Sequence, residues 1–177
     1  MRQNKKTVSP MSNEGRNIYV IEHITKSLLT LLGDKAIEDI SISELCDNAG
    51  IGRASFYRNF NSKEDILRAH INKIFNGWKS DWEKNNNLPL SSVIGMIFEH
   101  FEQHKAFYHL LNERRLIYLL KDVTLDIMEF KSDLPKYEVY AKAFVAYSLY
   151  GWIEVWFQRG MQESAEEMKQ LFQTQGL

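Results

Sequence analysis

The chain has 177 residues, of which 44% are hydrophobic and 25% are charged. This composition is that of an ordinary globular protein with enough apolar residues for a packed core, and it excludes a disordered or fibrous chain. Residues 1–80 carry 12 Lys and Arg against 9 Asp and Glu, a net charge of +3, while residues 81–177 carry 10 against 14, a net charge of −4. A mildly basic front half is compatible with nucleic-acid contact there, although so small an asymmetry does not establish it.

Targeting and cysteine signals are sparse. Cys46 is the single cysteine, which rules out an internal disulfide framework and fits a reducing compartment. The first fifteen residues contain no apolar core of a signal peptide. The longest uncharged apolar-rich stretch, 143–153, is much shorter than the roughly 20 residues of a membrane span. We therefore expect a soluble, cytoplasmic protein without a cofactor.

Apolar residues recur at helical spacing along most of the chain, and no strong alternating strand pattern is present. Ser-x-x-acid patterns that begin at Ser41, Ser62 and Ser164 mark helix starts, and glycines or prolines mark the ends. The helix 136–158 is apolar nearly all round, which predicts burial on every side. The predicted helices span about 14–32, 41–48, 52–59, 63–84, 90–101, 105–112, 114–131, 136–158 and 164–174.

Two of the short helices, 41–48 and 52–59, are joined by the turn Ala49-Gly50-Ile51-Gly52. A glycine-containing turn between two short helices is typical of a helix-turn-helix, because glycine adopts the positive φ at which the first helix stops. The apolar residues that would lock the two helices together are Leu45, Ala49, Ile51, Phe56 and Phe60. The sequence thus predicts a DNA-binding helix-turn-helix at about residues 41–60.

The second helix of this pair would enter the major groove. Arginine can bond a guanine edge at two points, and a small residue lets the helix approach closely. Tyrosine and lysine side chains can bind the DNA phosphates, and so can the backbone amides at the start of helix 41–48. The predicted DNA-binding residues are Ser41, Ser43, Arg53, Ala54, Ser55, Tyr57, Arg58, Asn59 and Lys63.

The segment 42–67 resembles the DNA-binding region of the TetR/AcrR family of one-component regulators. The likeness rests on the pattern A-G-I-x-R-x-S-F-Y-R-x-F-x-S-K-E-D-I-L from Ala49 to Leu67. Three positions depart from the family pattern: Gly52 stands where Ser is frequent, Ala54 where Gly is common and Asn59 where His is frequent. These departures affect the expected base preference and leave the fold prediction unchanged.

The resemblance implies an Ω-shaped homodimer, a ligand-sensing C-terminal domain and, usually, repression. The predicted fold is all-α, with a disordered basic arm at 1–13, an N-terminal three-helix helix-turn-helix DNA-binding domain at 14–62 and a C-terminal helical regulatory and dimerisation domain at 63–177. The helix 63–84 would link the two parts. The stretch from Gly151 to Met161 resembles a subgroup that includes regulators of dihydroxyacetone-kinase operons, from which no ligand is carried over.

Two sets of residues are expected in the C-terminal part. Aromatic residues could line a cavity for a small effector, and apolar residues of the last two helices exceed what one core can absorb, which predicts a four-helix interface between two copies. The predicted pocket comprises Phe98, Phe101, His104, Tyr108, Tyr118, Tyr140, Phe144 and Tyr147. The predicted dimer interface comprises Phe144, Ser148, Trp152, Val155, Trp156, Met168, Leu171 and Phe172.

Competing interpretations concern Cys46 and the pair His100 and His104. Cys46 fits a small buried residue better than a redox sensor. Histidines at i and i+4 can share a metal ion, which would allow a hydrolase, but Phe101 stands where a metalloprotease has its glutamate. We therefore predict no metal site, no catalytic residue and a ligand-controlled repressor that binds a near-palindromic operator as a homodimer. The alternative is an adaptor of the same fold that acts through a protein partner.

Overall fold

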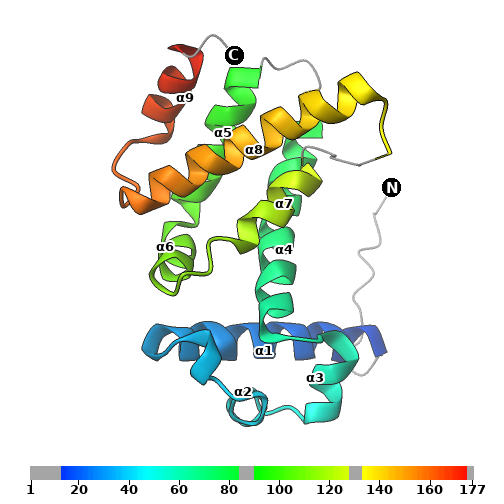
Figure 1. The fold of residues 1–177 in the computed structure, drawn as a ribbon. Helices are drawn as coiled ribbons and strands as arrows, with labels where there is room; N and C mark the ends of the chain where they lie inside the picture. The colour runs from blue at the N-terminus through cyan, green and yellow to red at the C-terminus, as the bar shows by residue number, and fades with distance from the viewer. Residues whose placement is uncertain (1–12, 84–89, 128–132, 175–177) are drawn as a thin grey trace, which may run out of the picture. The chain divides into compact units, whose positions relative to one another are not determined.

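The computed structural model describes residues 13–83, 90–127 and 133–174, and all the regular structure in these ranges is helical, as predicted (Figure 1). Contacts divide the chain into two compact units, one ending at Leu67 and the other beginning at Arg68. The basic arm predicted at 1–13 lies almost entirely outside the described residues. The helices are α1 (Asn13–Asp34), the 3₁₀ turn η1 (Ile37–Asp39), α2 (Ile42–Ala49), α3 (Arg53–Asn59), α4 (Lys63–Glu83), α5 (Leu90–Gln103), α6 (Lys105–Glu113), α7 (Leu119–Ile127), α8 (Lys136–Gln158) and α9 (Ala165–Thr174).

The first unit is built on α1, which packs against both α2 and α3. Ile24, Leu28 and Leu32 of α1 are fully buried, as their spacing of four residues predicts. They share the core with Leu45 of α2 and Phe56 of α3, both also fully buried. Helices α2 and α3, with 8 and 7 residues, are too short to be stable alone, and this apolar core holds them against α1.

The turn between α2 and α3 depends on Gly50. This residue has φ 67° and ψ 31°, the left-handed conformation in which a side chain is disfavoured. The amide of Ile51 donates to the carbonyl of Cys46 at 3.0 Å, which satisfies one of the last carbonyls of α2. The tight turn that the sequence predicts is therefore closed by its own backbone.

Side chains cap the helices at the three predicted starts. Ser62 and Asp65 cap α4 reciprocally, since each accepts a hydrogen bond from the other's backbone amide at 3.1 Å. Ser164 and Glu167 do the same for α9. Ser41 accepts from the amide of Glu44 at 3.1 Å, but the Glu44 carboxylate pairs with Lys35 instead of returning to the cap.

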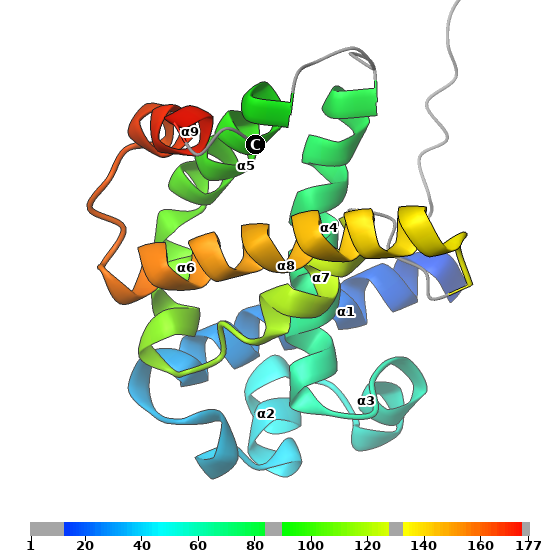
Figure 2. The same cartoon turned by 45° about the horizontal axis from the view of Figure 1, so that its top comes forward.

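The second unit has a core of aromatic rings from α5, α6 and α8. Figures 1 and 2 show α9 beside α5 and α7 beside α8, the two most extensive helix pairings of this unit. Phe98 and Trp156 meet edge to face, and Phe101 meets both Tyr108 and Phe157 in the same way. Such edge-to-face pairs add about 0.5–1.5 kcal/mol beyond the area that they bury.

The structure differs from the sequence prediction at three places. The predicted helix 114–131 is wrong at its start: α6 ends at Glu113, Arg115 follows in the left-handed region (φ 59°), and α7 begins at Leu119. Positions 128–131 lie outside the described residues. The turn η1 was not predicted. The expectation that α8 is buried on every side is also wrong for the single chain, because five of its large apolar side chains are exposed.

In the described ranges, none of the helices combines the length and the apolar character that a membrane crossing requires.

Candidate nucleic-acid interface

Helix α3 presents one buried and one exposed side. Phe56 is fully buried, and Phe60 just beyond the helix is also buried. Arg53, Ala54, Tyr57 and Arg58 are exposed, and Tyr57 keeps 59% of its surface accessible. The helix therefore offers two guanidinium groups and a phenol to a partner, and its sequence contains no acidic residue to repel phosphate.

Ser55 and Asn59 are half-buried at the edge of this exposed side. The Asn59 amide donates to the carbonyl of Ser55 at 2.8 Å, so its side chain lies back along α3. The amides of Ser55 and Phe56 donate to the carbonyl of Gly52, which starts the helix without a side-chain cap. Gly52 is exposed, so the backbone at the start of α3 is accessible to a partner.

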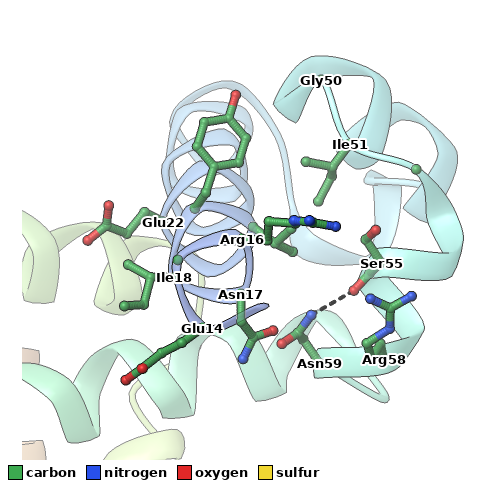
Figure 3. A pocket seen from close by; sticks show the side chains of 14 residues that line it. Glu14, Arg16, Asn17, Ile18, Glu22, Gly50, Ile51, Ser55, Arg58 and Asn59 are labelled. Carbon is green, nitrogen blue, oxygen red and sulfur yellow. Dashed lines mark hydrogen bonds between the residues drawn. The ribbon is translucent and has the colours of Figure 1, made fainter. Parts of the chain in front are cut away.

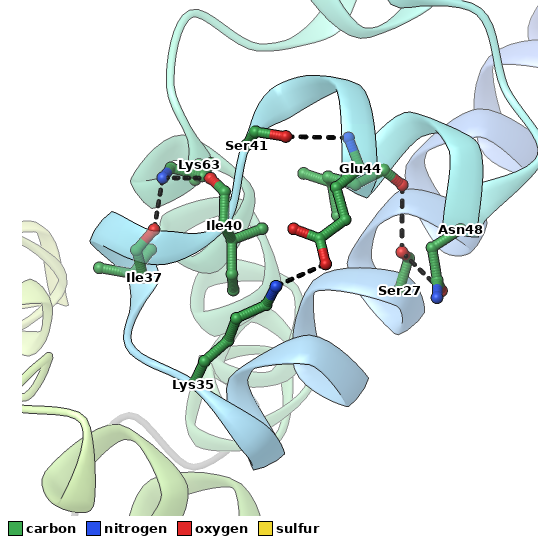
Figure 4. A network of polar contacts seen from close by, with 9 residues as sticks. Ser27, Lys35, Ile37, Ile40, Ser41, Glu44, Asn48 and Lys63 are labelled. Carbon is green, nitrogen blue, oxygen red and sulfur yellow. Dashed lines mark hydrogen bonds and ion pairs between the residues drawn. The ribbon is translucent and has the colours of Figure 1, made fainter.

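A polar network fixes α2 against α1 (Figure 4). The buried Ser27 hydroxyl of α1 lies 2.9 Å from the side-chain oxygen of Asn48 and 3.1 Å from the carbonyl oxygen of Leu45, and it donates to one of them at a time. Lys35, after α1, forms an ion pair with Glu44 of α2. These contacts fix the position of α2, which in turn supports the turn and α3.

Lys63 also belongs to this network. Its ammonium group donates to the carbonyl oxygens of Ile40, at 2.6 Å, and of Ile37. It thereby ties the start of α4 to the first residue of η1 and to the residue that follows η1 (Figure 4). An ammonium group has three donors, so one remains for a phosphate. Ser41 and Ser43, the other predicted contacts outside α3, are both exposed at the start of α2.

A groove lies between the first turns of α1 and the turn that precedes α3 (Figure 3). Ser55, Arg58 and Asn59 line it from α3, while Arg16 and Asn17 line it from α1. The sequence prediction did not place these two α1 residues beside α3, because the helix-turn-helix pattern begins only at residue 41. The polar run at the start of α1, ahead of its apolar spacing, was the available signal.

Cys46 is buried in the core of this unit. Burial and the neighbouring Asp47 carboxylate raise the pKa of its thiol, against the smaller opposing effect of Arg53. A raised pKa keeps the thiol protonated and unreactive. This environment favours the packing role of Cys46 over the redox sensor.

Two parts of the chain match known protein families. Residues 24–70 match the family described as "Bacterial regulatory proteins, tetR family", and residues 90–175 match a "Transcriptional regulator C-terminal region". In both of these parts the chain is similar to transcriptional regulators, and in residues 24–70 it is similar to those of the tetR family. The comparisons do not extend to the subgroup of dihydroxyacetone-kinase operon regulators, which stays a prediction. The family consists of transcription regulators, so the hydrolase interpretation is not supported.

Individual relatives agree with this assignment. The chain is 32% identical over 104 residues to the uncharacterized HTH-type transcriptional regulator YerO of Bacillus subtilis, a match that covers 54% of this chain and 36% of that protein. It is 33% identical over 86 residues to the HTH-type transcriptional regulator EthR of Mycobacterium tuberculosis, covering 43% of this chain and 39% of that protein. The matches thus span less than half of each relative's length. The crystal structure of Lin0861 from Listeria innocua superposes with a TM-score of 0.71 at 16% identity, over 95% of this chain and 94% of that one, which shows a shared fold.

The structure does not bring the eight predicted pocket residues together. Phe98, Phe101 and Tyr108 lie in the aromatic core, where they contact one another or their neighbours. His104 is half-buried beside His100. The remaining four, which are exposed, are Tyr118, Tyr140, Phe144 and Tyr147.

The predicted interface residues divide in a similar way. Trp156, Met168 and Phe172 are buried within the single chain. Val155, Leu171 and Phe144 are exposed, while Ser148 and Trp152 are half-buried. A surface for a second copy would therefore use the exposed side of α8 with the adjoining edge of α9.

His100 forms a polar pair inside the second unit. It is buried, and its Nε2 lies 3.0 Å from the Tyr108 hydroxyl. Burial, and secondarily the charge on His104, lower the pKa of His100 to about 4. Within the described residues, no three His, Cys, Asp or Glu side chains are grouped so that they could hold a metal ion. The geometry gives His100 a structural hydrogen bond.

Proposed function

We propose that this protein is a TetR-family transcriptional regulator that binds double-stranded DNA through α3. The observation that supports this best is the exposed side of α3, which offers Arg53, Tyr57 and Arg58 while Phe56 anchors the helix beneath. The arginines suit guanine edges in the major groove, and Ala54 allows close approach. Residues 14–62 would form the DNA-binding domain and residues 63–177 the regulatory and dimerisation domain.

Phosphate contacts would fix the position of α3 on the duplex. Tyr57, the remaining donor of Lys63 and the exposed serines Ser41 and Ser43 are the candidates. Ser55 and Asn59 lie beside the groove and would contact the same strand. We add Arg16 of α1, because it lines that groove together with Arg58. Because these contacts join positive side chains to phosphates, the affinity for DNA would fall steeply as the salt concentration rises.

One copy of α3 reads too little DNA for useful specificity. Its seven residues span about 10 Å at 1.5 Å per residue, which matches roughly three base-pair steps of 3.4 Å. Two copies would double the site and make it a near-palindrome, because the two-fold symmetry of the protein is repeated in the operator. We therefore propose a homodimer, as is typical of the family, that acts in the cytoplasm as a repressor.

A small effector would act by population shift. A ligand that binds more tightly to the form with low DNA affinity lowers operator occupancy by that difference in affinity. Of the predicted pocket residues, Phe98, Phe101 and Tyr108 are buried in the aromatic core, and an effector would have to be accommodated beside them. The adaptor alternative has no specific observation in its favour.

The test is a selection from random double-stranded DNA with the purified full chain, followed by binding titrations with the enriched sequence. We expect an enriched near-palindrome, and we expect Arg53→Ala or Arg58→Ala to lower affinity at least tenfold, or about 1.4 kcal/mol. Lys105→Ala, which removes an exposed positive charge from α6, is the matched control and should leave the DNA affinity unchanged. If no sequence is enriched, the proposed function is wrong and the adaptor is favoured.

A further inference from the structure

Three histidines lie close together where α4 contacts α5 and α6. The rings of His100, on α5, and His104, between α5 and α6, have centroids 4.8 Å apart. His70 of α4 meets Phe107 of α6 edge to face at 4.8 Å, and the charge on His104 acts on His70. The other two of the chain's five histidines are exposed. We call His70, His100 and His104 the histidine cluster.

The histidine cluster is packed against aromatic rings. His100 is buried, with the ring of Phe75 from α4 at a centroid distance of 4.1 Å and the Tyr108 hydroxyl 3.0 Å from its Nε2. His70 and His104 are half-buried. A protonated imidazole loses much of its hydration in such surroundings, which makes its charge costly.

The charges that act on the cluster are all positive. Burial, and then the charges on Lys73 and His104, lower the pKa of His70. Burial, and then the charge on His104, lower the pKa of His100 to about 4. Tyr108 faces His100 as a neutral phenol, because burial raises its pKa well above the usual value. No carboxylate of the described residues contributes to the shift of either histidine, so nothing there favours a proton.

The packed arrangement of the cluster therefore requires neutral histidines. An arrangement in which α4 moves away from α5 and α6 would let water reach the imidazoles and would separate the positive charges. The histidines would then bind protons more tightly than they do when packed. Because acid favours the form that binds more protons, a fall in pH shifts the population from the packed to the released form.

Helix α4 carries part of the cluster and also reaches the DNA-binding unit. It is one continuous helix from Lys63 to Glu83, and the first unit ends within it, at Leu67 (Figure 1). Lys63, at its start, is tied to the carbonyl oxygens of residues 37 and 40. His70 follows seven residues later, about 10 Å along the helix. A change in how firmly α4 is held at His70 is therefore passed along the same helix to the first unit.

We propose that the histidine cluster is a pH-sensitive switch, in which protonation releases α4 from α5 and α6 and thereby lowers the affinity of the protein for its operator. A released α4 is less ordered, and DNA binding must restore that order at a cost in affinity. In a dimer the cost applies to both half-sites, which must be met at a fixed spacing. This inference rests on the proposed DNA-binding function and adds the proton as an effector of it.

The expected direction is opposite to that of a simple charge effect. Protonated histidines add positive charge, which strengthens the attraction to DNA phosphates. The exposed His23 of α1, which belongs to the DNA-binding unit, would raise the affinity in acid for this reason. A fall in affinity between pH 7 and pH 5.5 therefore distinguishes the switch from direct contact between a histidine and DNA.

The test measures the operator affinity of the full chain at pH 7 and pH 5.5, at constant ionic strength, with the DNA sequence enriched by selection. A histidine that titrates near 6.5 when solvated and at about 4 when packed favours the released form roughly tenfold at pH 5.5, so we expect the dissociation constant to rise about tenfold. His70→Gln with His100→Gln removes both shifted titrations and should limit the rise to about twofold. His70→Gln alone changes only a half-buried position and should give an intermediate rise. His109→Gln, an exposed position on α6, is the matched control and should keep the wild-type rise.

Hydrogen exchange and circular dichroism separate the outcomes. Exchange over residues 68–76, corrected for the intrinsic effect of pH, should be faster at pH 5.5 in the wild type and not in the double variant, while both keep their helical signal. A wild-type affinity that is unchanged or higher at pH 5.5 overturns the inference and leaves the proposed function intact. The same holds if His70→Gln keeps the full wild-type rise, or if the wild type loses its helical signal at pH 5.5. A chain that enriches no DNA sequence at pH 7 overturns the proposed function itself.

Discussion

Acidification should destabilise the second unit through His100. At neutral pH this buried histidine is uncharged, and its ring faces Phe75, Tyr108 and His104. Its pKa is lowered to about 4, whereas a histidine in an unfolded chain titrates near 6.5. Between these two values the unfolded chain binds a proton that the folded chain does not bind. Stability is therefore present above about pH 6.5 and is lost as the pH falls toward 4.

The magnitude follows from the shift. One pKa unit corresponds to about 1.36 kcal/mol, so a difference of about 2.5 units limits the loss to roughly 3 kcal/mol by pH 4. All four tryptophans of the chain lie in residues 68–177, so tryptophan fluorescence reports on the second unit alone. Urea unfolding followed by fluorescence at pH 7, 5.5 and 4.5, at one protein concentration, measures the loss directly.

The decisive comparison is His100→Gln, which keeps a polar partner for Tyr108 and removes the titration. We expect its free energy of unfolding to fall much less between pH 7 and 4.5 than that of the wild type. His109→Gln changes an exposed histidine on α6 and should retain the wild-type pH dependence. The lowered pKa of His70 acts in the same direction in all three proteins and cancels in the comparison. If His100→Gln shows the wild-type slope, the attribution to His100 is refuted.

Three further outcomes are expected. Tyr57→Ala should weaken operator binding at least tenfold, or about 1.4 kcal/mol, without lowering stability, because the ring is exposed; unchanged affinity in a gel-shift titration with salt would contradict the docking. Lys63→Met should lower the stability of the first unit by about 1–3 kcal/mol, seen as faster hydrogen exchange around residues 37–40, because two carbonyls lose their donor; unaltered exchange would show that this link is dispensable. Val155→Glu should give monomers by light scattering while Gln103→Glu, on α5, stays dimeric; a dimeric Val155→Glu variant would move the interface elsewhere.

Local sequence patterns determined most of the helical architecture. The spacing of Ile24, Leu28 and Leu32 predicts the buried side of α1, and Gly50 predicts the turn before α3, because each depends on the conformation of neighbouring residues alone. The start of α7 could not be predicted in this way. Leu116 and Ile117 look like part of the apolar side of the predicted helix 114–131. Both are instead buried in a turn that contains Arg115 in the left-handed conformation. No glycine marks that turn, so only packing identifies it.

The candidate site shows the same division. The residue types on α3 already predict DNA contact, since arginine, serine and tyrosine at these positions suit bases and phosphates. Only the tertiary structure showed that Lys63 donates to carbonyls of the 37–40 turn and that Arg16 lines a groove with Arg58, because both facts join segments more than twenty residues apart. In α8 the apolar sequence predicted burial on every side. The structure instead left one side exposed, since the helices of a single chain cover only the other sides.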